Sequence, residues 1–231
     1  MLNEAFESLK EYDWGTDKAP LAPIDDAVAA SHGDEAARKD IERQLLKWLE
    51  SDISRDAKDY ICRKLALVGS AASVPMLSKL LGLENHSHMA RFAIERIPGH
   101  EATKALADAV ASSISSILKV GVMSSIGTRR DASSVAVLVS ALGSSDALVA
   151  KAAARALGQI GTTEAATALG NVKPSPEIFD AQFTCAEMLL ANNKIDDAMK
   201  IYRSLSLDYR AKLVRLAATR GVLACEAKAT M

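Results

Sequence analysis

The sequence predicts an all-α fold of the α-solenoid class, a superhelical stack of short helical hairpins. Three observations support this: a segment pattern that repeats along the chain, apolar residues spaced three and four apart, and no run that alternates with the period of two typical of a strand. The chain has 231 residues, of which 49% are hydrophobic and 25% are charged. It can therefore bury a substantial core, and we do not expect it to be disordered.

The repeat becomes visible when the ends of successive helices are aligned. Segments 61–77 and 90–106 and the segment from residue 152 place one apolar residue in register, as Leu65, Ile94 and Leu157. Three residues later a second apolar residue follows in each copy, as Val68, Ile97 and Ile160. A helix breaker comes next, as Gly69, Pro98 and Gly161. A further copy puts Met123, Ile126 and Gly127 in the same frame, before a short insertion at 129–131. Such hairpins bury an apolar face only against their neighbours.

Local signals place the individual helices along the chain. We expect a helix over 2–12, a loop through 14–23, and paired helices from about residue 23 onward. Turns are expected near residues 32, 52, 69, 83, 98, 128, 144, 161, 173, 192 and 206. Side chains that favour the first position of a helix support four of the starts, at Ser54, Asp146, Ser175 and Asp208.

Composition excludes several classes of protein. The net charge is −1, but residues 1–60 carry 15 acidic and 8 basic side chains, whereas residues 61–231 carry 14 and 20. An acidic lead-in therefore precedes a basic repeat region. Three separated cysteines, Cys62, Cys185 and Cys225, predict buried free thiols and a reducing compartment. No leader or membrane span is predicted, so we expect a cytoplasmic chain, or a fragment of a longer, exported one.

The segment 144–169 resembles the short HEAT-like repeat of bacterial proteins, the type found in phycobilin lyases. The residues that carry the resemblance are Asp146, Val149, Ala153, Ala154, Ala156, Leu157, Gly158, Ile160 and Gly161. In the family a basic residue usually follows the position of Val149, whereas this chain has Ala150 and then Lys151. The resemblance implies a right-handed superhelix of HEAT-like hairpins and, by analogy with the lyases, a chaperone-like holder of a bilin as one possible function.

The same comparison divides the chain by repeat type. Residues 55–170 resemble HEAT-like repeats, and residues 1–54 are expected to form an acidic N-terminal cap with the first helices. Within 171–231, the segment 186–205 looks like a tetratricopeptide hairpin, with its small and aromatic positions at Ala186, Leu189, Asn193, Ala198 and Tyr202. We expect all three parts to form a single solenoid domain.

Candidate metal and catalytic residues are few. His86 and His88 beside Glu84 are the one cluster with possible ligands, but a zinc site needs three or four, so we interpret the cluster as a turn before a helix that begins near Ser87. No catalytic motif is present, and we expect neither an enzyme nor a bound cofactor or metal. In the lead-in, the loop from Tyr12 to Gly15, with Trp14, is interpreted as a cap on the first hairpin, or alternatively as an aromatic peptide or sugar site.

Basic residues recur on the second helices of the hairpins, which line the concave face in this architecture. They are Arg63, Lys64, Arg91, Arg96, Lys119, Lys151, Arg155, Arg210 and Arg215. Solvated or ion-paired surface residues would give the same pattern. The pair Arg129–Arg130 is interpreted as a solvated turn.

From these cations we predict a non-enzymatic scaffold whose concave face binds another protein or a segment of a parent chain. Its contact residues would be Arg63, Lys64, Arg91, Lys151 and Arg155. Binding to a nucleic-acid phosphate backbone is the alternative, disfavoured because the basic region lacks aromatic platforms.

Overall fold

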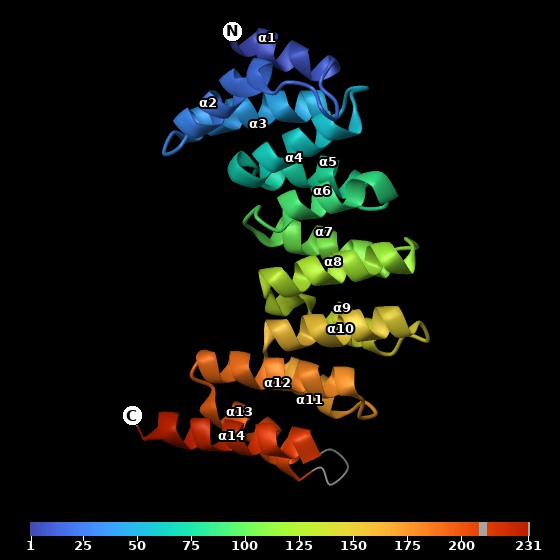
Figure 1. The fold of residues 1–231 in the computed structure, drawn as a ribbon, viewed down its shortest axis with the longest axis vertical. Coiled ribbons are helices and arrows are strands. Elements are labelled where there is room, and N and C mark those ends of the chain that lie inside the picture. The colour runs from blue at the N-terminus through green and yellow to red at the C-terminus, as the bar shows by residue number, and fades with distance from the viewer. Residues whose placement is uncertain (208–211, 231) are drawn as a thin grey trace. The chain divides into compact units, whose positions relative to one another are not determined.

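The structure, a computed structural model, describes residues 1–207 and 212–230. These residues contain helices and turns but no strand (Figure 1). The chain divides into two compact units, Met1–Ser125 and Ile126–Met231. Each unit is a stack of helical hairpins, so the predicted all-α solenoid class is confirmed. The boundaries predicted at residues 54 and 170 concern repeat type rather than compactness, and they stay a prediction.

Unit 1 begins with two short helices and continues into longer hairpins. Its α-helices are α1 (Leu2–Glu7), α2 (Ala22–Ala30), α3 (Glu35–Leu49), α4 (Arg55–Val68), α5 (Val74–Leu80), α6 (Glu84–Ile94) and α7 (His100–Ala111). Single 3₁₀ turns lie at Ser8–Lys10, Ala19–Leu21 and Ala71–Ser73. Helix α4 packs between α3 and α6, while α5 packs against α6 and α7. The boundary between the units falls within α8 (Ser116–Arg129).

Unit 2 repeats this arrangement of alternating helices. After a 3₁₀ turn at Ala132–Ser134, its helices are α9 (Val135–Leu142), α10 (Ala147–Ile160), α11 (Thr163–Gly170), α12 (Pro176–Ala191), α13 (Ile195–Ser206) and α14 (Lys212–Ala229). Helix α10 packs against α9, α11 and α12, and α13 packs between α12 and α14. The backbones of α10 and α12 lie close together at Gly158, where an added Cβ would lie 2.6 Å from the carbonyl oxygen of Ala181.

The aligned apolar residues form the core of both units. Leu65, Ile94 and Leu157 have no exposed surface, and the second set, Val68, Ile97 and Ile160, is buried as well. The predicted helix starts are confirmed at three positions, because the side chains of Ser54, Asp146 and Ser175 accept hydrogen bonds from backbone N–H groups of the first turn. Asp208, the fourth, lies outside the described residues.

Two predicted boundaries were wrong. The expected helix over 2–12 is α1 followed by a 3₁₀ turn that ends at Lys10. A turn over 112–115, between α7 and α8, was missed because Ser112 and Ser113 follow a continuous helical pattern without Gly or Pro. The turn expected near residue 128 is confirmed, because α8 ends at Arg129, and Gly127 lies within the helix. This glycine permits a close approach rather than ending the helix, since its Cβ position is filled by the Oε1 atom of Gln159.

A buried carboxylate links α3 to the turn between α4 and α5. Glu42 is 4% exposed. It accepts hydrogen bonds from the backbone N–H of Ser70 at 2.7 Å, from the Ser70 hydroxyl at 2.9 Å, and from the Ser73 hydroxyl at 2.5 Å. The three donors come from a segment about 30 residues away along the chain, so this one side chain fixes the turn against the preceding helix.

We predict that Glu42→Ala lowers the free energy of unfolding by about 1–3 kcal/mol, because the Ser70 and Ser73 donors lose a charged acceptor in a buried place. Urea denaturation followed by circular dichroism measures the change. Glu50→Ala, at an exposed position after α3, is the control and is expected to alter stability by less than about 0.5 kcal/mol. Equal stability of the two variants would contradict the role assigned to Glu42.

Candidate partner-binding surface

Two second helices of unit 1 place an arginine and a phenylalanine side by side. Arg63 on α4 and Phe92 on α6 each lie two residues before the aligned apolar residue, Leu65 or Ile94. Because α4 and α6 pack together, the equivalent positions meet. The guanidinium carbon of Arg63 lies 5.8 Å from the centre of the Phe92 ring.

One turn later, α4 presents Leu67, and the turn that follows α6 presents Arg96, which was expected on a second helix. Leu67 is 62% exposed. The guanidinium carbon of Arg96 lies 3.7 Å from the centre of the Phe92 ring. Arg63, Leu67, Phe92 and Arg96, which we call the unit 1 patch, therefore form a small surface of one aromatic ring, two guanidinium groups and an exposed aliphatic side chain.

The arginines of the unit 1 patch are held in place but keep part of their charge on the surface. Arg63 donates to Asp59 at 2.8 Å, and Arg96 donates to the backbone oxygen of Phe92 at 2.8 Å while lying 3.5 Å from Glu95. Both side chains are about half exposed. The contacts with Phe92 are of the cation–π type, which is worth about 0.5–1 kcal/mol at exposed sites.

Lys64, the next residue on α4, points back into unit 1. Its ammonium group pairs with Asp25 of α2 and lies 4.8 Å from the centre of the Tyr60 ring. The Tyr60 hydroxyl donates to the same carboxylate at 2.7 Å. Partial burial raises the pKa of Asp25, but the hydrogen bonds from Lys64 and Tyr60 and the charge of Lys64 together outweigh it, and the net pKa is lowered. Lys64 thus fastens α2 to α4, and its predicted contact with a partner stays untested.

Arg91 is a brace between α6 and α8. It is half-buried and donates to the backbone oxygen of Gly121 at 2.9 Å, with the Ser125 hydroxyl at 3.4 Å. Burial lowers the pKa of this arginine, and the nearby charge of Glu95 opposes the shift. Gly121 makes room for the guanidinium group, since an added Cβ would lie 2.8 Å from its central carbon. As with Lys64, a partner contact at Arg91 stays a prediction.

The two predicted contacts in unit 2 differ from one another. Lys151 of α10 pairs with Glu177 of α12 at 2.5 Å. The hydrogen bond from Lys151, followed by those from the backbone and Ser175, lowers the pKa of Glu177 to about 2. Arg155 occupies the register position of Arg63 and is exposed, without an ion pair to any residue in 1–207 or 212–230.

The remaining cations of the predicted row are less informative. Lys119 lies on α8 and Arg215 on α14. Arg210 lies outside the described residues. Arg129 is the last residue of α8, and Arg130 follows it in a left-handed conformation with φ of 55°.

The N-terminal loop was expected to cap the first hairpin, and this prediction was right for Tyr12 and wrong for Trp14. Tyr12 contacts Tyr60 at a ring separation of 6.0 Å, and its backbone oxygen accepts from Ser54 at 2.6 Å. Trp14 is 88% exposed. The indole that covers apolar surface here is Trp48, stacked on Phe6 at 6.5 Å.

The structure places the histidine cluster on α6 and the three cysteines on α4, α12 and α14. Helix α6 begins at Glu84, not near Ser87, because Leu83 in extended conformation precedes it and accepts from the Ser87 N–H. No group of three possible metal ligands occurs among residues 1–207 and 212–230. The cysteines are buried and free, as predicted. Burial raises the pKa values of Cys62 and Cys185 to about 12, which disfavours the thiolate form.

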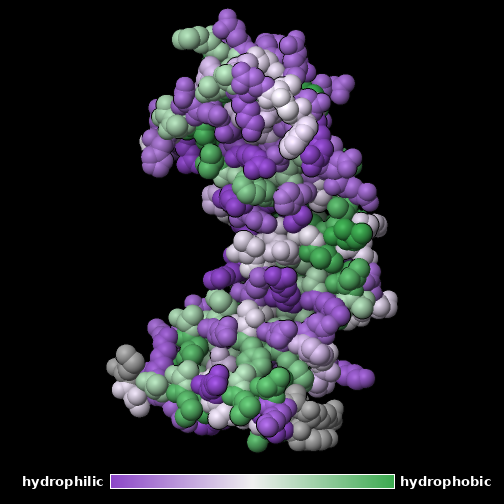
Figure 2. Space-filling view, viewed as in Figure 1, coloured by the Kyte–Doolittle hydropathy of each residue, from purple (hydrophilic) through white to green (hydrophobic). Residues whose placement is uncertain are grey.

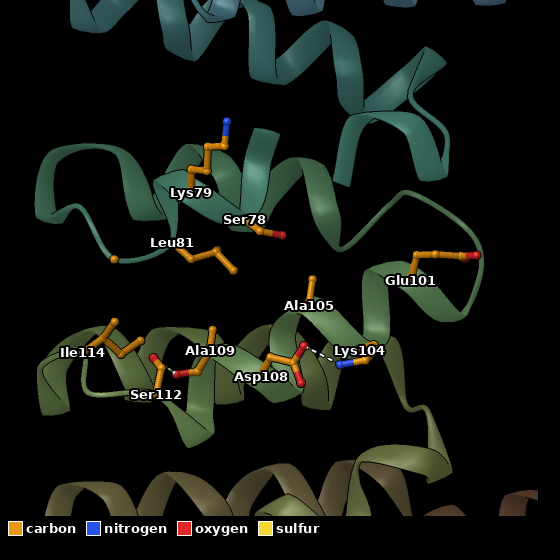
Figure 3. A pocket seen from close by; sticks show the side chains of 11 residues that line it. Ser78, Lys79, Leu81, Glu101, Lys104, Ala105, Asp108, Ala109, Ser112 and Ile114 are labelled. Carbon is orange, nitrogen blue, oxygen red and sulfur yellow. Dashed lines mark hydrogen bonds and ion pairs between the residues drawn. The ribbon is translucent and has the colours of Figure 1, made fainter. Parts of the chain in front are cut away.

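A shallow groove of about 510 Å³ lies on the surface of unit 1 between α5 and α7 (Figure 3). Leu81 and the alanines 105 and 109 face it, and Ile114 lies at one end. The polar side chains at its edge are engaged or turned away: Lys104 pairs with Asp108 at 2.6 Å, and Lys79 points away from the groove. The groove has no converging polar groups of the kind that orient a small ligand.

Comparison with known proteins agrees with the repeat architecture. Residues 103–176 match the family of HEAT repeats. The structure is similar to an archaeal HEAT-like repeats protein from Thermococcus onnurineus NA1, with a TM-score of 0.53 and 13% identity over 98% of this chain and 97% of that chain.

Two further comparisons add no evidence on function. The structure of human deoxyhypusine hydroxylase in complex with glycerol matches 88% of this chain and 96% of the hydroxylase chain at 14% identity. Its TM-score of 0.37 is too low to support an inference. No curated protein sequence matches. In the described residues, no helix is both long and apolar enough to span a bilayer. The HEAT-like fold is thus shown, whereas the resemblances to bilin lyases and tetratricopeptides stay untested.

We predict that Arg91 and Gly121 depend on each other. Gly121→Ala is expected to destabilise the wild type, because the new methyl group displaces the guanidinium group from its carbonyl partner. In an Arg91→Ala background the same change should instead stabilise by about 0.5–1 kcal/mol, since alanine favours a helix interior over glycine. Urea denaturation of the four proteins measures both effects, and an unchanged sign would contradict the brace.

A second prediction concerns pH and the Asp25 carboxylate. Its folded pKa is lowered below the ordinary value of 3.8, so its stabilisation is fully present above that value and is lost as the pH falls through the lower folded pKa. Asp25→Asn should therefore lower Tm at pH 7 and have a smaller effect at pH 3. The carboxylate is about half exposed, which limits the effect to about 1 kcal/mol. Asp26→Asn at the exposed neighbouring position is the control; an equal loss of Tm at both pH values would contradict the prediction.

Proposed function

We propose that this chain is a non-enzymatic scaffold that binds a protein partner through exposed faces of its second helices. The observation that carries the proposal is the unit 1 patch, which combines arginine, aromatic and exposed aliphatic side chains on α4, on α6 and in the turn that follows α6. Arginine and aromatic residues are enriched at the centres of protein–protein interfaces. The match to HEAT repeats supports the scaffold class, because such repeats provide extended binding surfaces.

The chemistry of the unit 1 patch favours one kind of partner. Leu67 offers an apolar contact, and Arg63 and Arg96 offer guanidinium forks suited to carboxylates. A segment with an apolar side chain flanked by Asp or Glu would satisfy both. Asp59 and Glu95 already offset part of the positive charge, which makes the patch a poor electrostatic site for a phosphate backbone.

Preorganisation also supports a binding role. Both arginines are already in contact with Phe92, and each has a hydrogen-bond acceptor four residues earlier in the chain, Asp59 for Arg63 and the Phe92 backbone oxygen for Arg96. Their side chains therefore lose less rotational freedom on binding than those of unrestrained arginines. Binding by nucleic acid or by a bilin has no comparable observation in its favour, and both become outcomes of the experiment.

The test is affinity capture from native extract with tagged variants, at about 50 and 300 mM salt and with nuclease. We expect a discrete protein to be retained by the wild type at both salt concentrations and lost, with a rise in Kd of at least about tenfold, when Arg63→Glu is combined with Leu67→Ser. Tenfold corresponds to about 1.4 kcal/mol.

The matched control, Lys79→Glu with Leu83→Ser, changes an exposed lysine and an exposed leucine elsewhere in unit 1. A third variant, Lys151→Glu with Arg155→Glu, tests whether the cations of unit 2 contribute. Retention of the partner by the patch variant, or capture of nucleic acid that disappears at 300 mM salt, would count against the proposal.

A further inference from the structure

Helix α14 packs closely on α13 through one side only. Ala218 and Cys225 are fully buried there, and Gly221 allows the Tyr202 ring so near that an added Cβ would lie 2.3 Å from it. Cys225 and Gly221 lie on the same side as Ala218, at spacings of seven and three residues, which places them on one face of the helix. The opposite face of α14 is the one to be explained.

That opposite face is apolar, although it is exposed. Its residues recur at spacings of three and four, and they are Leu213, Leu216, Ala217, Arg220, Leu223, Ala224 and Ala227, which we call the α14 stripe. The three leucines are 80%, 54% and 59% exposed, in that order. In Figure 2, green apolar side chains gather over the part of unit 2 where Figure 1 draws α12 to α14. A surface helix normally presents polar residues on such a face.

We propose that a second copy of this chain covers the α14 stripe, with the two α14 helices antiparallel about a two-fold axis at Arg220. The size pattern of the stripe carries this proposal. In that register Leu213 lies opposite the partner's Ala227, Leu216 opposite the partner's Ala224, and Ala217 opposite the partner's Leu223. Every leucine thus meets an alanine, which allows the interdigitation that close helix packing needs.

Charges on the edge of the stripe fit the same arrangement. Lys212, Thr219 and Glu226 recur at intervals of seven along one edge of the stripe and are exposed. In an antiparallel pair with two-fold symmetry, this edge of one helix faces the same edge of the other. Lys212 then lies about 3 Å along the helix axis from the partner's Glu226, given a rise of about 1.5 Å per residue, and the two opposite charges pair twice in the dimer.

Arg220 limits the strength of the association. It meets the partner's Arg220 at the axis, where two like charges repel each other, and screening by salt weakens that repulsion. The stripe is also narrow, because one helix of 18 residues is about 27 Å long and about 10 Å wide, whereas a standard interface buries about 800 Å² per partner. We therefore expect a weak, reversible dimer with a Kd in the micromolar range.

Sedimentation velocity of the full chain, at about 2 to 200 µM, tests the proposal. The wild type should shift from monomer to dimer with concentration. Leu216→Ser with Leu223→Ser should leave only monomer, and folding is checked by circular dichroism, since both leucines are exposed. Leu148→Ser, at an exposed position on α10, is the control and should dimerise like the wild type. A wild type that stays monomeric at 200 µM would overturn the proposal.

Two further variants separate a second copy from other occupants. Arg220→Ser should strengthen the dimer several-fold; a weaker dimer would mean that Arg220 pairs with an acidic group, and the proposed register would be wrong. Under oxidising conditions, Arg220→Cys should cross-link two chains. A disulfide needs Cα atoms about 4.4–6.8 Å apart, and a residue comes that close to its own counterpart in the second copy only near the two-fold axis. Thr219→Cys should cross-link more slowly.

This proposal is independent of the scaffold function. The unit 1 patch variant should dimerise like the wild type, and the variant with Leu216→Ser and Leu223→Ser should retain the captured partner. Cross-linking of Thr219→Cys in preference to Arg220→Cys would contradict the axis placed at Arg220.

Discussion

Burial of the aligned apolar residues between neighbouring helices is the constraint on which the rest of the structure depends. A hairpin of this length cannot enclose Leu65 or Leu157 by itself. The helix that carries each residue therefore packs against the second helix of the following hairpin, α6 or α12. The close spacing of α10 and α12 is possible because Gly158 carries no Cβ where Ala181 approaches. Small residues at these contacts determine how near the helices come, and larger ones fill the space that remains.

This constraint separates structural cations from those available to a partner. A basic side chain next to the buried register has little room to extend into solvent, and its head group finds acceptors on the neighbouring helix. Lys64 and Arg91 are of this kind, with Asp25 and the Gly121 carbonyl as acceptors. Arg63 and Arg155 each stand two residues before the aligned leucine, and both remain on the surface. Two adjacent positions on one helix, 63 and 64, thus differ in role because they differ in angle about the helix axis.

The sequence was sufficient for the fold but only partly for the candidate site. Apolar spacing and helix-start residues are local signals, which is why the register of Leu65, Ile94 and Leu157 and the starts at Ser54, Asp146 and Ser175 were predicted correctly. The turn at 112–115 was missed because serines carry no strong breaking signal. The Arg91 brace could not have been predicted, because its acceptor is a backbone carbonyl, that of Gly121. Every residue type has such a carbonyl, so the sequence does not distinguish this one. Phe92 was not among the predicted contact residues, because that prediction rested on charged side chains alone; its position two residues before Ile94, in register with Arg63, was the available signal.

The exposed face of a helix carries either polar side chains, which water solvates, or apolar ones, which another surface must cover. Helix α1 adopts the first solution, with Glu4 and Glu7 exposed and Phe6 turned inward onto Trp48. Helix α14 adopts the second, because Leu213, Leu216 and Leu223 share its outer face. A pattern in which each leucine has an alanine at the mirrored position about Arg220 is not required for solubility or for packing on α13, and an identical helix lying opposite would explain it.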